Sequence, residues 1–215
     1  MSYKLKKIRK IIENIKGTDL FQQAFLHTSY LNELKLKGSS EPELNSKSNP
    51  KHSYETLEFL GDSVLNFYTS LFIYHKFPNY AEGQMSKLKQ SMVRESTLAF
   101  LSREIGLGEF LQLGTGERKN GGAEKESILS DIFESFVAAL YLEKGGKVVR
   151  HFLNLTVFTW VEGKENMTWD YKSKLQEYCQ AQKNWVSYRE KQRKREKGQQ
   201  LFIMEVRDKS RTFCE

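Results

Sequence analysis

The residues in this sequence best suited to chemistry are two pairs of carboxylates, each set within an apolar helical pattern. Glu58 and Asp62 form the first pair, in the run 54–65. Residues four apart share one face of a helix, with Cβ atoms about 5–6 Å apart. Like charges held so close in a partly desolvated place repel each other unless protons or cations neutralise them. The pair therefore favours a hard divalent metal ion as its partner.

Asp131 and Glu134 form the second pair, in the helical run 126–140. A spacing of three also places both side chains on one helix face, and the small Ser135 beside them leaves room for another helix to approach. Two such helices could bring four carboxylates together in an oxygen-only site suited to Mg²⁺. Two-metal phosphodiester cleavage uses an arrangement of this kind, in which one ion activates water and the other stabilises the leaving oxygen.

A solvated helix face is the usual explanation of an isolated acidic pair, and it competes with the metal site here. The apolar surroundings argue against it, because the two pairs are the only charged residues within 56–74 and 127–142, and large apolar residues adjoin them. Charged residues in such places are rarely unpartnered. The two pairs together therefore favour a catalytic site over a solvated surface.

The same residues resemble a known family, the bacterial-type ribonuclease III enzymes. The run from Tyr54 to Leu65, which reads YETLEFLGDSVL, carries the most specific part of the resemblance. Further matching blocks follow in order along nearly all of residues 1 to 160, at 27–30, 77–83, 85–89, 113–117, 121–122 and the helix of the second acidic pair. The resemblance implies an all-helical domain that dimerises. It also implies double-stranded RNA as substrate and products with 5′-phosphate and 3′-hydroxyl ends.

Carried over by position, the resemblance assigns the four carboxylates to the Mg²⁺ site. It implies that Glu58, Asp62, Asp131 and Glu134 bind Mg²⁺, for which Mn²⁺ can substitute, and that Asp62 and Glu134 are the catalytic pair closest to the chemistry. The same comparison gives Glu55 a role as a dimer contact or an orienting acid rather than a fifth ligand.

The aromatic run 67–74 and the glycine-rich segment 113–122 each have two explanations. Periodicity alone is consistent with either a simple core or a buried subunit interface for the aromatic run. The resemblance favours the interface, and thus a homodimer. The glycine-rich segment, with Arg118 and Lys119, could hold phosphates on its backbone N–H groups, although such segments are commonly plain connections.

The remaining elements are read from hydrophobic periodicity and from helix-breaking residues. Residues 3 to 16 have apolar residues at helical spacing, Gly17 ends that pattern, and Thr18 is a candidate N-cap for the next helix. We expect a core helix from residue 54 onward and a surface loop at 35–53, where an RNA contact competes with a passive insertion. The expected apolar stripe of the core helix is Leu57, Leu60, Val64 and Leu71.

The C-terminal part resembles the start of a double-stranded-RNA-binding domain. We place the catalytic domain at 1–162, a linker at 163–168 and this partial α/β domain at 169–215, so the fold class is mainly α. The resemblance gives its opening helix an RNA contact through Gln176 and Glu177. Two strands are expected at 186–188 and 201–206.

The segment between those strands departs from the family pattern. A basic run, 188–198, replaces the expected glycine- and proline-containing loop, and the chain stops at Glu215, where the family continues with a lysine-rich helix. A solvated loop and a nonspecific phosphate grip are the two explanations of the run. The residues that would form the phosphate grip are Arg189, Lys191, Arg193, Lys194 and Arg195.

Composition agrees with a polyanionic partner but does not identify one. The chain has 215 residues, a formal net charge of +7 and a pI near 9.2. Its two cysteines, Cys179 and Cys214, lack metal-ligand spacing, which favours free thiols in a reducing compartment. No stretch has the length of a membrane span and no signal-peptide pattern opens the chain, so we expect a cytoplasmic protein.

These observations predict a metal-dependent endoribonuclease that hydrolyses double-stranded RNA as a homodimer. Its expected role is in processing structured precursors such as rRNA or mRNA. A noncatalytic RNA-binding protein that keeps the fold is the alternative, and the presence of all four carboxylates argues against it. A DNA nuclease ranks third, because carboxylate-bound metal does not itself select the sugar.

Overall fold

The computed structural model describes residues 3–36, 52–162, 175, 178–196, 199–207 and 212–214. Most of the 35–53 loop and the 163–168 linker, with the predictions made for them, lie outside the described residues. The chain divides into two compact units, Met1–Gly163 and Lys164–Glu215. Each unit is described by itself.

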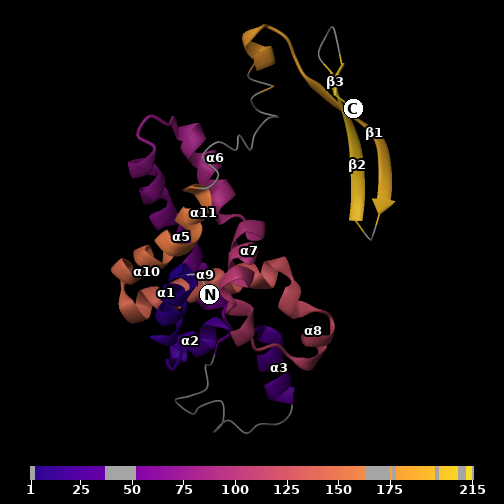
Figure 1. The fold of residues 1–215 in the computed structure, drawn as a ribbon. Helices are drawn as coiled ribbons and strands as arrows, with labels where there is room; N and C mark the ends of the chain where they lie inside the picture. Colours follow the sequence, from indigo (N-terminus) through magenta and orange to yellow (C-terminus); the bar gives the residue numbers. More distant parts are fainter. Residues whose placement is uncertain are drawn as a thin grey trace. The chain divides into compact units, whose positions relative to one another are not determined.

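The first unit is helical throughout its described elements (Figure 1). The helices are α1 (Tyr3–Glu13), α2 (Asp19–Ala24), α3 (Thr28–Leu36), α5 (Glu55–Lys76), α6 (Glu82–Val93), α7 (Glu95–Ile105), α8 (Thr115–Lys119), α9 (Glu126–Lys144), α10 (Gly146–Leu153) and α11 (Thr159–Glu162). Short 3₁₀ turns are η1 (Leu107–Phe110) and η2 (Gly122–Glu124), and η3 (Asn154–Phe158) is a π-helical turn between α10 and α11. The mainly helical fold class is confirmed.

Helix α9 is the central helix of this unit, with α2, α5, α7 and α10 packed around it (Figure 1). The predicted stripe of Ile128, Ile132, Phe136 and Leu140 is buried. Residues on its other sides are buried too, among them Phe133 and Val137. A helix that is apolar on nearly all sides needs neighbours on all sides, and this explains why α9 occupies the centre.

The buried face of α5 differs from the predicted stripe. Helix α5 buries Leu57, Gly61, Leu65, Thr69 and Ile73, whereas Leu60, Val64 and Leu71 are only partly buried. Apolar periodicity alone gave the wrong face here, because the buried face of α5 includes a glycine and a threonine as well as large apolar residues. The helix itself and its start near residue 54 are as predicted.

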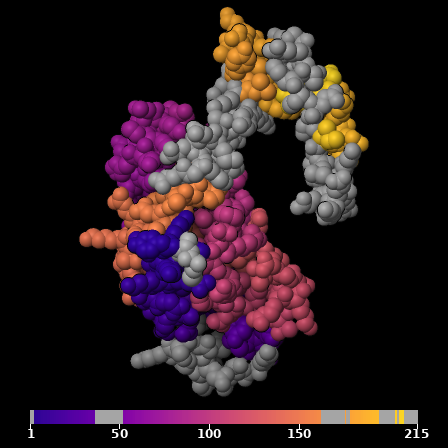
Figure 2. Space-filling view, viewed as in Figure 1, coloured from indigo at the N-terminus to yellow at the C-terminus, as the bar shows by residue number. Residues whose placement is uncertain are grey.

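The N-terminal segment packs beside the end of the first unit. Thr18 caps α2 as predicted, since its side-chain oxygen accepts a hydrogen bond from the N–H of Phe21 at 3.2 Å. In the space-filling view the indigo N-terminal segment adjoins the orange segment of α10 to α11 (Figure 2). Leu5 and Ile8 of α1 line a small cavity together with Trp160 of α11, so the two ends of the unit cover one another.

The second unit contains a three-stranded antiparallel sheet in the order β1-β2-β3. Its strands are β1 (Ser187–Glu196), β2 (Gln199–Arg207) and β3 (Thr212–Cys214). The register pairs Tyr188 with Val206 and Arg193 with Phe202, and it shifts between Glu190 and Gln192. The predicted strand 201–206 lies within β2, but β1 extends through residues 188–196, so this part of the basic run is a strand and not a loop. Charged residues have a low strand propensity, and the backbone hydrogen bonds to β2 stabilise the strand in spite of it.

Two expectations drawn from composition can be compared with the described residues. Cys179 is buried and carries a free thiol, as expected. Within the described residues, no helix combines the length and the apolar character needed to cross a membrane.

Candidate active site

The two acidic pairs meet where α5 crosses α9, and a glycine sets the closeness of the crossing. Gly61 is buried, and a Cβ atom added there would overlap the backbone carbonyl of Glu134. Asp62 follows Gly61 directly, and Glu58 lies one turn before it on the same helix. Because Gly61 has no side chain, the acidic face of α5 can lie against the acidic face of α9.

Burial and mutual repulsion disfavour the charged forms of two of these acids. Burial and, to a smaller extent, the charges of Asp62, Glu58 and Asp131 together raise the pKa of Glu134 to about 8. Burial likewise raises the pKa of Glu58 to about 7, with contributions from Asp131, Glu55 and Asp62. These carboxylates are thus close enough to disturb one another, and a cation would relieve the repulsion.

Asp131 has a neutral partner that counters part of this effect. Burial raises the pKa of Asp131, while a hydrogen bond from Tyr54 opposes the rise. The hydroxyl of Tyr54 donates to Oδ2 of Asp131 at 3.1 Å. Burial and the neighbouring negative charge of Asp131 also raise the pKa of Tyr54, so this phenol stays protonated and remains a donor.

The backbone of Tyr54 is held on both sides, which fixes the position of its ring. Its N–H donates to the carbonyl of Leu26 at 2.9 Å, and its carbonyl accepts a bond from the hydroxyl of Ser135 at 3.4 Å. Its side chain is only 4% exposed. Tyr54 is therefore a rigid support for the carboxylate of Asp131.

The two remaining acids on α5 also have hydrogen-bond partners. The amide of Asn66 donates to Oδ1 of Asp62 at 2.6 Å and to the Asp62 carbonyl at 2.9 Å. Glu55, in the first turn of α5, accepts a bond of 2.7 Å from the hydroxyl of Thr28. Glu55 thus has a hydroxyl partner of its own, although its charge still contributes to the raised pKa of Glu58.

The donor set fits a hard divalent ion that keeps much of its water. Within the described residues, no three His, Cys, Asp or Glu side chains are grouped as a ready-made metal site. Mg²⁺ does not require such a group, because it is usually bound by one or two carboxylates and completes its octahedron with water and substrate phosphate. An all-oxygen set whose members raise one another's pKa has the chemistry that this ion prefers.

The glycine-rich segment 113–122 is not a plain loop. It contains α8, and its N–H groups are partly engaged already: Gly114 donates to Oγ of Ser29 at 3.0 Å and Thr115 donates to Oε2 of Glu33 at 2.6 Å. These bonds attach the segment to α3. A phosphate would have to use the other N–H groups of the segment, so its phosphate role stays a prediction.

The predicted RNA-binding residues belong to the second unit. Gln176 and Glu177 lie outside the described residues. Arg189, Lys191 and Arg193 have exposed side chains on β1. Lys194 and Arg195 continue the same strand, and only their backbone is described. Arg193 is already paired, since its guanidinium bonds to the Glu190 carboxylate at 3.1 and 3.2 Å.

Sequence reasoning missed three residues that shape the site. Asn66 follows Asp62 by four residues, so the same-face spacing was a usable signal for it. Gly61 stands in the middle of an apolar helical run, where a glycine commonly marks a close helix approach. For Tyr54 the sequence held no such signal, because its partner Asp131 is 77 positions away.

Large aromatic side chains are exposed along a different face of α5. Phe59 is 79% exposed, Phe67 61% and Tyr74 66%. Three exposed aromatic residues on one side of a single helix are more than scattered surface residues.

Comparison with known proteins gives one consistent result for the first unit. The family model described as Ribonuclease-III-like matches residues 17–160. Ribonuclease 3 of Streptococcus thermophilus is 42% identical over 163 residues, which cover 75% of this chain and 66% of that protein. Ribonuclease 3 of Mesoplasma florum is 39% identical over 170 residues, covering 78% and 68%. The chain thus spans about two thirds of the length of these relatives.

Solved structures give the same result for the fold. One structure of the nuclease domain of ribonuclease III from Campylobacter jejuni has a TM-score of 0.55 and 33% identity, covering 69% of this chain and 94% of that one. A second structure of that domain has a TM-score of 0.54 and 31% identity, covering 76% and 97%. The first is described as flexible in a region involved in dimer formation.

Proposed function

The chain belongs to the ribonuclease III family, and on that premise we propose that it is an endoribonuclease that hydrolyses double-stranded RNA. The observation that supports this most is the meeting of the two acidic pairs at the Gly61 crossing. Processing of structured precursors such as rRNA is the corresponding role. A noncatalytic family member would need no such cluster, because partly buried acids destabilise the fold and would serve no function there.

Glu58, Asp62, Asp131 and Glu134 would hold Mg²⁺, with Asp62 and Glu134 closest to the reacting phosphate. When bound, the metal supplies an activated water and stabilises the charge that develops on the leaving oxygen. Repulsion among these acids, expressed in the raised pKa values of Glu58 and Glu134, is the property that supports cation binding here.

The protein's own contribution is to fix the acids before substrate arrives. Tyr54 keeps one oxygen of Asp131 in place, and the other oxygen stays available as a ligand. Asn66 does the same for Asp62. Preorganised ligands of this kind reduce the reorganisation needed at the moment of reaction.

We further propose that the protein acts as a homodimer through the exposed aromatic face of α5. Phe59 follows Glu58 directly, so the aromatic face adjoins the acidic face on the same helix. A two-fold interface across this helix would place two acidic sites in one symmetric groove, one for each strand of a duplex. Glu55, at the start of the same helix, would be a contact or orienting acid.

The second unit is proposed as a double-stranded-RNA-binding unit with an accessory role. The exposed side chains of Arg189 and Lys191 on β1 suit a nonspecific grip on phosphates, and Arg193 would share its charge with Glu190. Lys194, Arg195, Gln176 and Glu177 belong to the same proposal.

A cleavage assay on three substrates tests the proposed function. Purified protein is incubated with duplex RNA, single-stranded RNA and duplex DNA, in Mg²⁺, Mn²⁺, Ca²⁺ or chelator. We expect cleavage of duplex RNA alone with Mg²⁺ or Mn²⁺, and poor turnover with Ca²⁺, whose looser geometry aligns water less well. Undiminished cutting in excess chelator would contradict the metal mechanism, and binding of duplex RNA without cutting in any metal would favour the noncatalytic alternative.

A further inference from the structure

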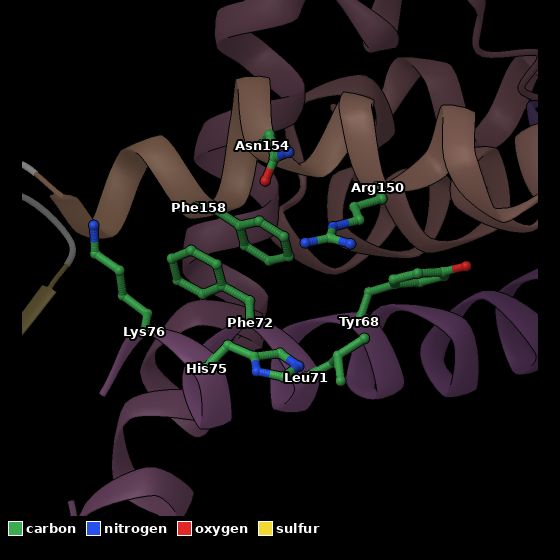
Figure 3. Close-up of a pocket in the computed structure, with 8 residues that line it drawn as sticks. All are labelled: Tyr68, Leu71, Phe72, His75, Lys76, Arg150, Asn154 and Phe158. Atoms are coloured by element: carbon green, nitrogen blue, oxygen red, sulfur yellow. The ribbon is translucent and has the colours of Figure 1, made fainter. Parts of the chain in front are cut away.

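A second cavity lies farther along α5, away from the four carboxylates (Figure 3). It has a volume of about 210 Å³ and is formed between the C-terminal half of α5 and the segment of α10 and η3. Its first lining residue, Tyr68, comes six positions after Asp62, a rise of about 9 Å along the helix. None of the four carboxylates lines it.

The walls of the cavity are aromatic and firmly packed. Phe72 and Phe158 stack with ring centroids 4.2 Å apart and planes 6° apart, which joins α5 to η3. Tyr68 forms the opposite wall (Figure 3). Its ring is seated against the start of α10, where a Cβ atom added at Gly146 would overlap the tyrosine hydroxyl. Such walls suit one flat ring system.

The charged side chains around the cavity are the cations Arg150 and Lys76, beside the polar residues Asn154 and His75. No carboxylate of the described residues lines it. In Figure 3 the guanidinium of Arg150 extends from α10 over the space between the rings of Phe158 and Tyr68. Within the described part of the chain, this guanidinium forms no hydrogen bond or ion pair. A planar, weakly hydrated cation of this kind pairs with phosphate through two parallel bonds.

The backbone beside the cavity is irregular as well. Asn154 and Phe158, both lining residues, begin and end the π-helical turn η3. The hydroxyl of Thr159 donates to the carbonyl of Asn154, which satisfies an acceptor within this turn. Turns of this type are frequent at functional sites.

We propose that this cavity binds a nucleoside monophosphate, with the base between the aromatic walls and the phosphate on Arg150. The volume is below the range of about 300–1,000 Å³ that drug-sized ligands occupy, so it suits one ring system with its charged group at the mouth. The cationic lining matches a phosphate, which carries up to two charges, better than a single carboxylate. The nucleotide could be free or could be an unpaired residue of an RNA strand.

Calorimetric titration of the full chain in chelator tests this site without metal or cleavage. The ligands are AMP, adenosine, inorganic phosphate and a short single-stranded oligonucleotide. We expect AMP to bind about tenfold or more tightly than adenosine or phosphate, because each of these lacks one half of the recognised structure. Equal binding of phosphate and AMP, or no binding of AMP, would overturn the proposal.

Two variants on one helix separate the site from general positive charge. Arg150→Gln should weaken AMP binding about tenfold or more, whereas Lys147→Gln, an exposed cation on α10 outside the cavity, should leave it unchanged. A far-ultraviolet melting curve confirms that both variants fold. Equal loss in the two variants would mean nonspecific attraction and would overturn the proposal.

Glu134→Gln separates this cavity from the carboxylate site. We expect unchanged AMP binding in that variant, and a loss would place the nucleotide at the carboxylates and overturn the proposal. Competition between AMP and the oligonucleotide would assign the natural source to RNA, and independent binding would assign it to free nucleotide; either result supports the site. Because the titration involves no cleavage, failure of the proposed nuclease activity would not change the AMP-binding result.

Discussion

The hydroxyl of Tyr54 donates a hydrogen bond of 3.1 Å to Oδ2 of Asp131, although the two residues are 77 positions apart in the chain. This bond joins the start of α5 to the acidic face of α9. Because it favours the charged carboxylate, it opposes the effect of burial on the pKa of Asp131. One buried phenol therefore helps to keep a proposed metal ligand ready to bind.

Tyr54→Phe should lower the affinity for metal while having little effect on the free energy of unfolding. The phenyl ring fills the same space, but without the hydroxyl the pKa of Asp131 rises further and its orientation loosens. We expect an affinity for Mn²⁺ about tenfold lower in calorimetry at pH 7. Tyr141→Phe, at an exposed tyrosine on α9, is the matched control. Unchanged affinity in Tyr54→Phe would mean that the bond has no role in metal binding.

Gly61→Ala should be strongly destabilising. Its methyl group would overlap the Glu134 carbonyl, so α5 and α9 must separate, at a cost of about 3 kcal/mol in the free energy of unfolding. Gly83 is the matched control, because it also lies in a helix and an added Cβ meets no atom within 4 Å. Gly83→Ala should stabilise by up to about 1 kcal/mol. Urea denaturation of both variants measures the difference, and equal effects would contradict the close crossing.

The carboxylates could be found from the sequence because helical periodicity is a local property. Glu58 with Asp62, and Asp131 with Glu134, each share a helix face by spacing alone. Convergence of the two faces is nonlocal, and the sequence only hinted at it through small residues. The partner of Gly61 is a backbone carbonyl on another helix, which no spacing rule contains.

The predictions that were wrong also failed because of contacts between residues far apart in the sequence. Leu60 and Val64 have the apolar side chains typical of a core, but the buried face of α5 runs through Gly61 and Thr69. Leu60 and Val64 are therefore only partly buried. The basic run 188–198 was open to a loop explanation, yet backbone pairing with β2 makes most of it strand. Tertiary contacts overrode local composition in both places.

In chelator, stability should fall as the pH rises from about 4.5 to 8. The pKa values of Glu58 and Glu134 are raised to about 7 and about 8, so the folded state binds protons that the unfolded chain has already released. The stability that these two groups contribute is fully present below their pKa in the unfolded chain. It is lost as the pH rises through their pKa in the folded state. Melting curves of wild type and the Glu58→Gln/Glu134→Gln double variant should converge in acid and separate near pH 8, with wild type less stable. Mg²⁺ should restore wild type, and parallel curves in chelator would contradict this coupling.

Deleting residues 165–215 should change RNA binding more than cleavage. If the second unit adds mainly phosphate contacts, the deletion weakens binding most at low salt and reduces the slope of log affinity against log salt. Cleavage at low ionic strength should survive. Binding measured over a salt series, with gel filtration to compare assembly states, tests this. Complete loss of cleavage with an unchanged assembly state would show that the second unit positions the substrate.

Glu134→Gln should separate catalysis from binding. The change keeps the shape of the side chain and removes one charge from the acidic group, so the metal-free protein should be stabilised near pH 8, on the order of 2 kcal/mol after allowance for solvent screening. Affinity for duplex RNA should hold or rise, because repulsion of phosphate falls. Turnover should drop about a hundredfold or more, because the metal loses a ligand that fixes its place in the transition state.

A mobility shift and a cleavage time course on the same duplex, with a melting curve, measure the three effects of Glu134→Gln. Glu143→Gln, on the same helix but nine residues beyond Glu134, is the control and should match wild type in all three. Cleavage at near wild-type rate in Glu134→Gln would make Glu134 an ordinary surface acid and remove the basis of the four-carboxylate site. A joint fall of binding and cleavage would instead give Glu134 a structural role, since only a lost metal ligand reduces turnover while the duplex stays bound.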